Sequence, residues 1–168
     1  MDADAKKTAL RMIPYGLYVL TAAGKDGRKS AATVNWVTQA SFAPPLVAVG
    51  VKADSLTHAL IDEAGEFVLN VIAKGDNALA YAFFKPAYVV GNKIGGEVFA
   101  DGAVVKAPVL DKAPAHVECK VVEAIKKGDH TLFVAEVVEA RVKTQPAGRA
   151  DDAICWLKDL GEKVYYGG

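Results

Sequence analysis

The sequence predicts a mainly β fold of the α+β class, organised as one domain (residues 1–168) with two or three short helices. Short runs rich in Val, Ile and Thr alternate with turn sequences of Gly, Pro and Asp along most of the 168 residues, a pattern typical of antiparallel strands. Helical periodicity is confined to short segments that end at Gly or Pro. A chain of this length can bury a sizeable core. We therefore predict a small β-barrel, which has no free sheet edges and can leave an opening for one ligand.

The composition argues against several function classes. The 20 basic and 20 acidic residues give a formal net charge of zero, with no dense basic block, so we expect neither a nucleic-acid partner nor an anionic membrane. The hydrophobic share of 52% is high for a soluble protein and suggests apolar surface buried in an oligomer. Met1–Lys7 has acids where a signal peptide is basic, and no apolar run is long enough for a membrane span. The expected location is cytoplasmic.

Two cysteines offer neither metal-ligand spacing nor a disulfide framework. Cys119 lies in an apolar strand sequence, where a buried and inert thiol is the default. Cys155 precedes Trp156 near the end of the chain. We expect no metal site and assign neither thiol a catalytic role.

The first part of the chain predicts an antiparallel meander. After a polar lead-in, Thr8–Met12 favours a helical turn that ends before Pro14. Gly16–Ala23 is typical of a strand, and Lys25–Arg28 contains the Asp-Gly pair of a tight hairpin. The next segment, Ala31–Ser41, pairs back from that turn.

Ala31–Ser41 carries no charge and mixes hydrogen-bonding with apolar side chains. In an extended strand, alternate side chains point to opposite faces. One face would carry Thr33, Asn35, Val37, Gln39 and Ser41, and the other Val34, Trp36, Thr38, Ala40 and Phe42. Such a strand suits a pocket in which a few polar groups orient a mostly apolar ligand; a β core with satisfied polar groups is the alternative. Pro44–Pro45 stops the pairing, and Leu46–Val51 is typical of a strand buried on both faces.

A short helix is predicted after this buried strand, with Asp54 or Ser55 as its N-cap and Gly65 at its end. Ser55 and Thr57 lie in the first turn, and Lys52 lies just upstream. Free amides at a helix N-terminus, two hydroxyls and a cation together suit a phosphate group. An ordinary capped helix is the alternative.

The middle of the chain predicts a strand, a helix and a loop. Asn70 interrupts the apolar strand Phe67–Ile72, and its amide needs buried partners, for example in a neighbouring loop that it braces. Asp76–Lys85 predicts a second helix, and the glycine-rich Val89–Pro108 predicts a loop or flap. The large apolar side chains of the second helix cover most of its circumference, as a core cluster or a dimer contact: Leu79, Tyr81, Phe83 and Phe84.

The clearest hairpin comes near the end of the chain. Ala115–Ile125 and Thr131–Thr144 predict its strands, and Lys126–His130 joins them. The alternation is broken in the second strand, which indicates a bulge. Thr144–Ala153 is linker-like, and we expect the residues after it to pack back onto the fold.

The run from Thr33 to Val49 resembles the signature segment of the flavin reductase-like, FMN-binding split-barrel proteins, which include flavoredoxin. The similarity continues over Lys52–Asn70 and returns at Gly128–Phe133 and Gly167–Gly168. This resemblance implies a split Greek-key β-barrel and a homodimer with FMN near the subunit interface. The sequence lacks the G-x-G-x-x-G fingerprint of a nicotinamide-binding Rossmann domain, so NADH or NADPH would bind transiently against the exposed flavin face.

The resemblance also implies residue roles. His130 would lie near the flavin, where it hydrogen-bonds the nicotinamide carboxamide or shapes the space for that ring. A turn histidine bonded to a neighbouring carbonyl is the alternative. Ser55 and Thr57, with Lys52, would hold the FMN phosphate. The residues expected around the isoalloxazine are Thr33, Val34, Asn35, Trp36, Val37, Thr38 and Ser41.

Three functions are compatible with these features. The first is an NAD(P)H-dependent flavin reductase that passes electrons to a separate acceptor, for example a monooxygenase. The second is a flavoredoxin-type FMN electron carrier reduced by a protein partner, and the third is a non-enzymatic ligand-binding barrel. Flavin colour separates the third function from the others, and bleaching of that colour by NADH or NADPH separates the first from the second.

Overall fold

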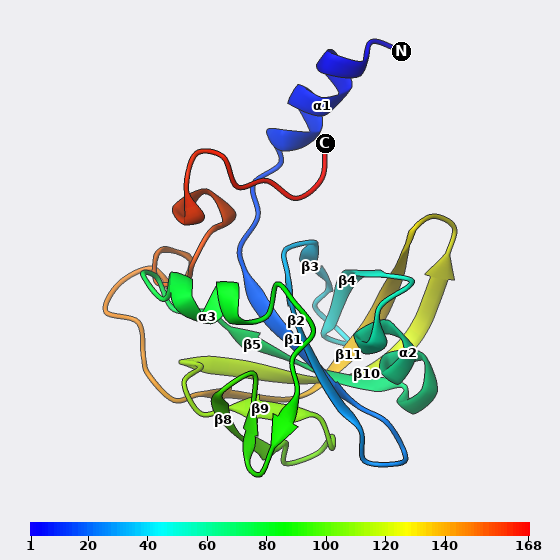
Figure 1. Cartoon of the computed structure of the whole chain (residues 1–168), viewed down its shortest axis with the longest axis vertical. Coiled ribbons are helices and arrows are strands. Elements are labelled where there is room, and N and C mark those ends of the chain that lie inside the picture. The colour runs from blue at the N-terminus through cyan, green and yellow to red at the C-terminus, as the bar shows by residue number, and fades with distance from the viewer.

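The computed structural model describes residues 1–168 and contains a seven-stranded antiparallel sheet that curves into a barrel (Figure 1). Across the sheet, the strands are β2 (Lys29–Val34), β1 (Tyr18–Ala23), β5 (Glu66–Val71), β10 (Ala115–Lys126), β11 (His130–Val142), β4 (Leu46–Lys52) and β3 (Val37–Ser41). The outermost strands, β2 and β3, follow each other in the chain and are separated only by Asn35 and Trp36. The two ends of the sheet order therefore meet at these residues. This architecture confirms the predicted α+β split barrel.

Ala31–Ser41 is not the single continuous strand that its pattern predicts. Val34 ends β2 and Val37 begins β3, and the amide of Val37 donates to the carbonyl of Asn35 at 3.0 Å. The alternation of faces therefore holds within each half but not across the break. Side chains of β2 and of β3 belong to opposite ends of the sheet order.

Three α-helices are present, each with an acceptor side chain at its N-cap: α1 (Ala3–Arg11), α2 (Leu56–Ala64) and α3 (Asn77–Ala82). The first is longer than the predicted helical turn, because the Asp2 carboxylate accepts from the amide of Ala5 at 2.7 Å and starts the helix early. It buries no residue and projects from the barrel beside the C-terminal segment (Figure 1). The second ends at Gly65, which has the left-handed φ of 72° that glycine favours.

The prediction of a loop or flap over Val89–Pro108 is wrong. These residues build most of a four-stranded antiparallel sheet of β6 (Val89–Val90), β7 (Lys93–Ile94), β8 (Glu97–Asp101) and β9 (Pro108–Leu110). The glycines that suggested a loop instead form the tight turns: Gly91, Gly95 and Gly96 have φ values of 60°, 58° and 89°, a region that other residues rarely adopt.

Asn70 braces the segment that contains β9, as its isolated polarity predicts. Its Oδ1 accepts from the amide of Leu110 at 2.8 Å, and its Nδ2 donates to the carbonyl of Pro108 at 3.3 Å. The residue is fully buried, so these bonds satisfy an amide that would otherwise be expensive to desolvate.

The hairpin of β10 and β11 is confirmed. Its register shifts between Glu118 and Cys119 and between Val121 and Glu123, which agrees with the predicted bulge. Cys119 and Cys155 are both buried, and burial raises the pKa of their thiols to about 12 and about 11. Neither is an activated nucleophile.

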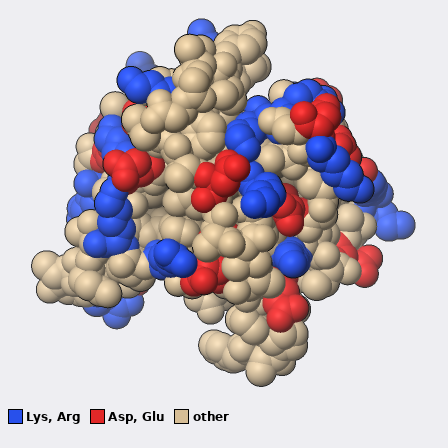
Figure 2. All heavy atoms as spheres, turned by 90° about the horizontal axis from the view of Figure 1, so that it is seen from below, with Lys and Arg blue, Asp and Glu red and all other residues tan.

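The outer surface shows mixed charge. In Figure 2, basic and acidic side chains alternate over the visible face, without a large patch of one sign. None of the helices has both the length and the apolar character needed to cross a lipid bilayer.

Candidate functional site

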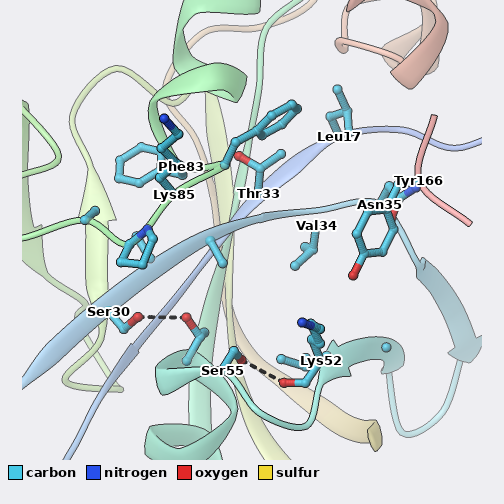
Figure 3. A pocket seen from close by; sticks show the side chains of 18 of the residues that line it. Leu17, Ser30, Thr33, Val34, Asn35, Lys52, Ser55, Phe83, Lys85 and Tyr166 are labelled. Carbon is cyan, nitrogen blue, oxygen red and sulfur yellow. Dashed lines mark hydrogen bonds between the residues drawn. The ribbon is translucent and has the colours of Figure 1, made fainter. Parts of the chain in front are cut away.

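A cavity of about 550 Å³, here called the main cavity, lies between β2, the start of α2 and the residues after α3 (Figure 3). Of its 23 lining residues, 13 are hydrophobic. This volume and a mostly apolar wall with a few polar groups are typical of small-molecule sites. The C-terminal residues Val164, Tyr165 and Tyr166 also line it.

The start of α2 forms one end of the main cavity. The hydroxyl of Ser55 caps the helix: it accepts from the amide of His58 at 3.1 Å and donates to the carbonyl of Lys52 at 2.8 Å. The amides of Leu56 and Thr57 find no acceptor in the chain, and both residues line the cavity. Unpaired amides and the helix dipole favour an anionic group here.

A buried hydroxyl pair supplements these amides. The Oγ of Ser30 and the Oγ1 of Thr57 are 2.7 Å apart, and both residues are almost fully buried. Each hydroxyl has one proton, and their mutual hydrogen bond uses only one of the two. The pair therefore keeps a proton to donate. Lys52 adds a cation, which pairs with exposed Asp54 at 3.1 Å.

Asn35 brings an unpaired donor to the cavity. The residue is 4% exposed, lines the cavity, and its Nδ2 has no hydrogen-bond partner. A buried donor without a partner destabilises a fold by about 1–3 kcal/mol. Such a group is expected where a ligand supplies the missing acceptor.

An aromatic group of Trp36, His130 and Tyr166 adjoins the cavity. The imidazole centroid lies 4.5 Å from that of the indole, and the Tyr166 ring meets the indole edge-on at 5.4 Å. The Nε2 of His130 is hydrogen-bonded to the Tyr166 hydroxyl at 2.8 Å, and its Nδ1 to Asp129 at 2.9 Å. This bond to His130 lowers the pKa of the Asp129 carboxyl. The indole Nε1 of Trp36 is buried without a partner.

The structure brings together six of the residues predicted from the sequence. Those that line the main cavity are Thr33, Val34, Asn35, Lys52, Ser55 and Thr57. Thr33 also holds α3, because its hydroxyl donates to the carbonyl of Ala80 at 2.7 Å. Trp36 and His130 do not line the cavity and instead contact Tyr166, which does. Val37, Thr38 and Ser41 lie on β3, which pairs with β4, and are not part of its lining.

Sequence reasoning missed several lining residues. Ser30 had no signal of its own, because its partner Thr57 is 27 positions away. Phe83–Ala87 follow the second helix, and Val164–Tyr166 lie near the C-terminus. The expectation that the end of the chain packs back onto the fold was the only pointer to this last group.

The fold and this site define a small split-barrel protein with a mostly apolar cavity that presents a few unpaired hydrogen-bond donors. The sequence profile described as "Flavin reductase like domain" matches residues 10–158. The chain belongs to this family, as its resemblance indicated.

Two curated relatives are reductases. The reductase component of 4-nitrophenol 4-monooxygenase/4-nitrocatechol 2-monooxygenase from Rhodococcus opacus is 37% identical over 132 residues, which cover 77% of this chain and 66% of that protein. The flavin reductase (NADH) of Kitasatospora aureofaciens is 31% identical over 139 residues, covering 82% of this chain and 71% of that protein. The chain spans 24% of another relative, diflavin flavoprotein A 1 of Synechocystis sp., at 32% identity over 84% of this chain.

A solved structure agrees with this assignment. The NADH:FAD oxidoreductase SgcE6 of Streptomyces globisporus, in complex with NAD and FAD fragments, superposes with a TM-score of 0.68. The two proteins are 28% identical, and the match covers 77% of this chain and 76% of that chain.

Proposed function

We propose that the protein is a flavin reductase that binds FMN in the main cavity, accepts a hydride from NADH or NADPH, and passes electrons to a separate acceptor. The observation that carries this proposal is the buried Nδ2 of Asn35, which lacks an acceptor in an apolar cavity. The free amides of Leu56 and Thr57 also line this cavity. A flavin mononucleotide offers what these groups lack: a polar ring edge with acceptors and a terminal phosphate.

The relatives support the same reaction. The Kitasatospora protein is named for its use of NADH, and the Streptomyces structure contains NAD and FAD fragments. The Rhodococcus relative is the reductase component of a monooxygenase, so an oxygenase is the acceptor we favour. We propose FMN over FAD because the unpaired amides and the spare hydroxyl proton suit a terminal phosphate.

In this proposal the bound flavin supplies the redox chemistry, and the protein supplies position and electrostatics. Asn35 would donate to the polar edge of a bound flavin ring, where a hydrogen-bond donor favours a more negative ring. Leu56, Thr57 and Ser30 would hold the phosphate, while Val34 belongs to the apolar wall. Hydride transfer needs no nucleophile, which agrees with buried cysteines of raised pKa.

A homodimer belongs to the same proposal. Large apolar side chains remain exposed on the single chain, including Phe42 at 95% and Tyr88 at 81%. Tyr81 and Phe84 also form an exposed edge-to-face pair, with centroids 5.1 Å apart. Exposed aromatic side chains are enriched at protein interfaces. Light scattering of the FMN-loaded protein at micromolar concentration should give the mass of two chains.

A cytoplasmic location also remains a prediction.

The direct test uses purified protein and three flavins. FMN should bind more tightly than riboflavin or FAD, and anaerobic NADH or NADPH should bleach the FMN-loaded protein. Flavin binding without bleaching by either nicotinamide would instead indicate an electron carrier reduced by a protein partner. Failure to bind any flavin would leave only the ligand-binding barrel.

A further inference from the structure

A second cavity, of about 530 Å³, adjoins the main cavity. Leu157, Val164, Tyr165 and Tyr166 line both of them, so a thin wall of C-terminal residues separates the two spaces. The remaining lining comes from the end of α1, the chain after it, and the segment around Trp156. Figure 1 shows α1 and the C-terminal segment side by side at this end of the molecule.

Unpaired cations mark the second cavity. Arg28, Arg141 and Arg149 each pair with a carboxylate; the fourth arginine, Arg11, has no carboxylate partner and lies in the lining. Its guanidinium carbon is instead 4.1 Å from the centroid of the Tyr165 ring. This geometry leaves the guanidinium N–H groups available for a planar or phosphate ligand.

Lys158 is a second cation in this lining that lies near an aromatic ring. Its Nζ is 6.0 Å from the centroid of the Trp156 ring and has no carboxylate partner. The indole is held in place, because its Nε1 donates to the carbonyl of Asp151 at 3.0 Å. Glu162 is the one acid in the lining, so the charged side chains that line the cavity sum to a net positive charge. Half-buried Tyr15 adds another aromatic surface.

We propose that the second cavity binds the adenosine phosphate part of a dinucleotide whose other half lies in the main cavity. Two unpaired cations suit its phosphates, and fixed aromatic side chains offer faces for the adenine ring. The shared wall at Val164–Tyr166 lets one ligand occupy both spaces. This inference rests on the proposed reductase function, and NADH or NADPH is the dinucleotide we favour; FAD is the other source of the same chemistry.

The test compares NADH with reduced nicotinamide mononucleotide, which carries the same reactive ring but lacks the adenosine phosphate. Wild-type, FMN-loaded protein should have a lower KM for NADH than for the mononucleotide. Arg11→Ala combined with Lys158→Ala should raise the KM for NADH by on the order of tenfold or more, without changing the KM for the mononucleotide. Lys163→Ala is the matched control, because Lys163 carries the same charge on the same segment but does not line the cavity.

Binding measurements identify the source of the adenosine phosphate. Calorimetric titration of ADP into the FMN-loaded protein should give a complex that the double variant loses and Lys163→Ala keeps. If the double variant weakens FAD but not FMN, and leaves NADH kinetics unchanged, the site is assigned to the adenosine phosphate of FAD. If ADP does not bind, NADH and the mononucleotide have equal KM values and FAD affinity does not change, the inference is overturned while the reductase function stands. If neither nicotinamide reduces bound flavin, the proposed function itself fails. The melting temperatures of the variants should stay close to that of wild type, because the side chains of Arg11 and Lys158 are exposed.

Discussion

The main cavity has two ends that are built in different ways. One lies at the start of α2 and is here called the helix end; the other lies near Asn35 and Tyr166 and is here called the ring end. At the helix end, the hydroxyls of Ser55 and Thr57 already have partners within the chain. At the ring end, the side-chain nitrogens of Asn35 and Trp36 are buried without partners. The side chains at the first end are thus held in place before a ligand arrives, while its free amides and spare hydroxyl proton stay available. At the second end the side chains themselves lack partners.

This difference separates two tasks. Secondary structure positions the amides of α2, so the anion site is preorganised. The ring end depends on side-chain contacts near the C-terminus: between Glu162 and Gly168 the only backbone hydrogen bond runs from the amide of Val164 to the carbonyl of Gly161. Few backbone bonds and half-exposed tyrosines are features of segments that open locally at little free-energy cost. The ring end is therefore the part of the cavity that we expect to adjust to ligands.

The largest effect is expected at the helix end. Ser55→Ala with Thr57→Ala should weaken FMN by about 10- to 100-fold, because the change removes the cap that positions the free amides of α2 and breaks the Ser30–Thr57 pair whose spare proton would bond the charged phosphate. Riboflavin, which has no phosphate, should lose little. Fluorescence titration of both flavins measures the difference, and equal weakening of the two would remove the phosphate assignment. The variant should also lose about 1 kcal/mol of stability, because Ser55 caps α2.

Asn35→Leu should raise stability, whereas Ser55→Ala with Thr57→Ala should lower it. The two variants therefore distinguish the ring end from the helix end. Removing a buried, unpaired donor should stabilise the flavin-free protein by about 1 kcal/mol. The same change should weaken FMN and riboflavin equally, by on the order of tenfold, because both carry the ring. Denaturant unfolding and flavin titration test these outcomes.

Thr38→Val is the control for Asn35. Thr38 belongs to the same sequence motif but lies exposed on β3 and does not line the main cavity. Flavin affinity should not change. Loss of flavin binding in this variant would mean that a second chain or a rearrangement brings β3 to the ligand.

The two ends also differ in how far the sequence predicted them. The helix and its candidate anion site could be predicted from the sequence, because their signals are local: Ser55, Gly65 and the apolar spacing between them. The break at Asn35 and Trp36 could not, because uncharged, β-branched neighbours predict an unbroken strand and only the closure of the barrel interrupts it. Tyr166 is 36 positions from His130, a separation over which no periodic pattern operates.

His130→Ala tests whether the ring end serves the nicotinamide. The imidazole contacts Trp36 and Tyr166 rather than the cavity itself. If it positions the nicotinamide, flavin reduction by NAD(P)H should slow by on the order of tenfold, while FMN affinity and melting temperature hold. If it is only structural, the melting temperature should fall and the reduction rate per loaded site should not change. Stopped-flow reduction and thermal melts distinguish these outcomes.

The smallest effect is expected from Tyr166→Phe, which keeps the aromatic ring and removes only the hydroxyl bonded to His130. Loss of one half-exposed hydrogen bond should loosen the C-terminal segment without unfolding the barrel. Amide hydrogen exchange over residues 162–168 should therefore accelerate, with the melting temperature nearly constant. Tyr165→Phe is the matched control, because the Tyr165 hydroxyl has no hydrogen-bond partner in the chain and its ring packs against Arg11. Equal acceleration in both variants would show that the hydrogen bond to His130 does not hold the C-terminal segment in place.

The pH dependence of this exchange sharpens the same test. Burial raises the pKa of the Tyr166 hydroxyl above its ordinary value of 10.0, because the phenolate is harder to bury than the phenol. A folded-state pKa that is raised means that the closed segment is favoured below pH 10 and loses this contribution as pH rises through the raised value. The difference in exchange between wild type and Tyr166→Phe should therefore be constant from pH 7 to 9, after correction for intrinsic exchange, and should shrink above pH 10. A difference that disappears already at neutral pH would mean that the hydroxyl does not hold the segment, and that ring packing against Trp36 alone keeps the wall between the two cavities in place.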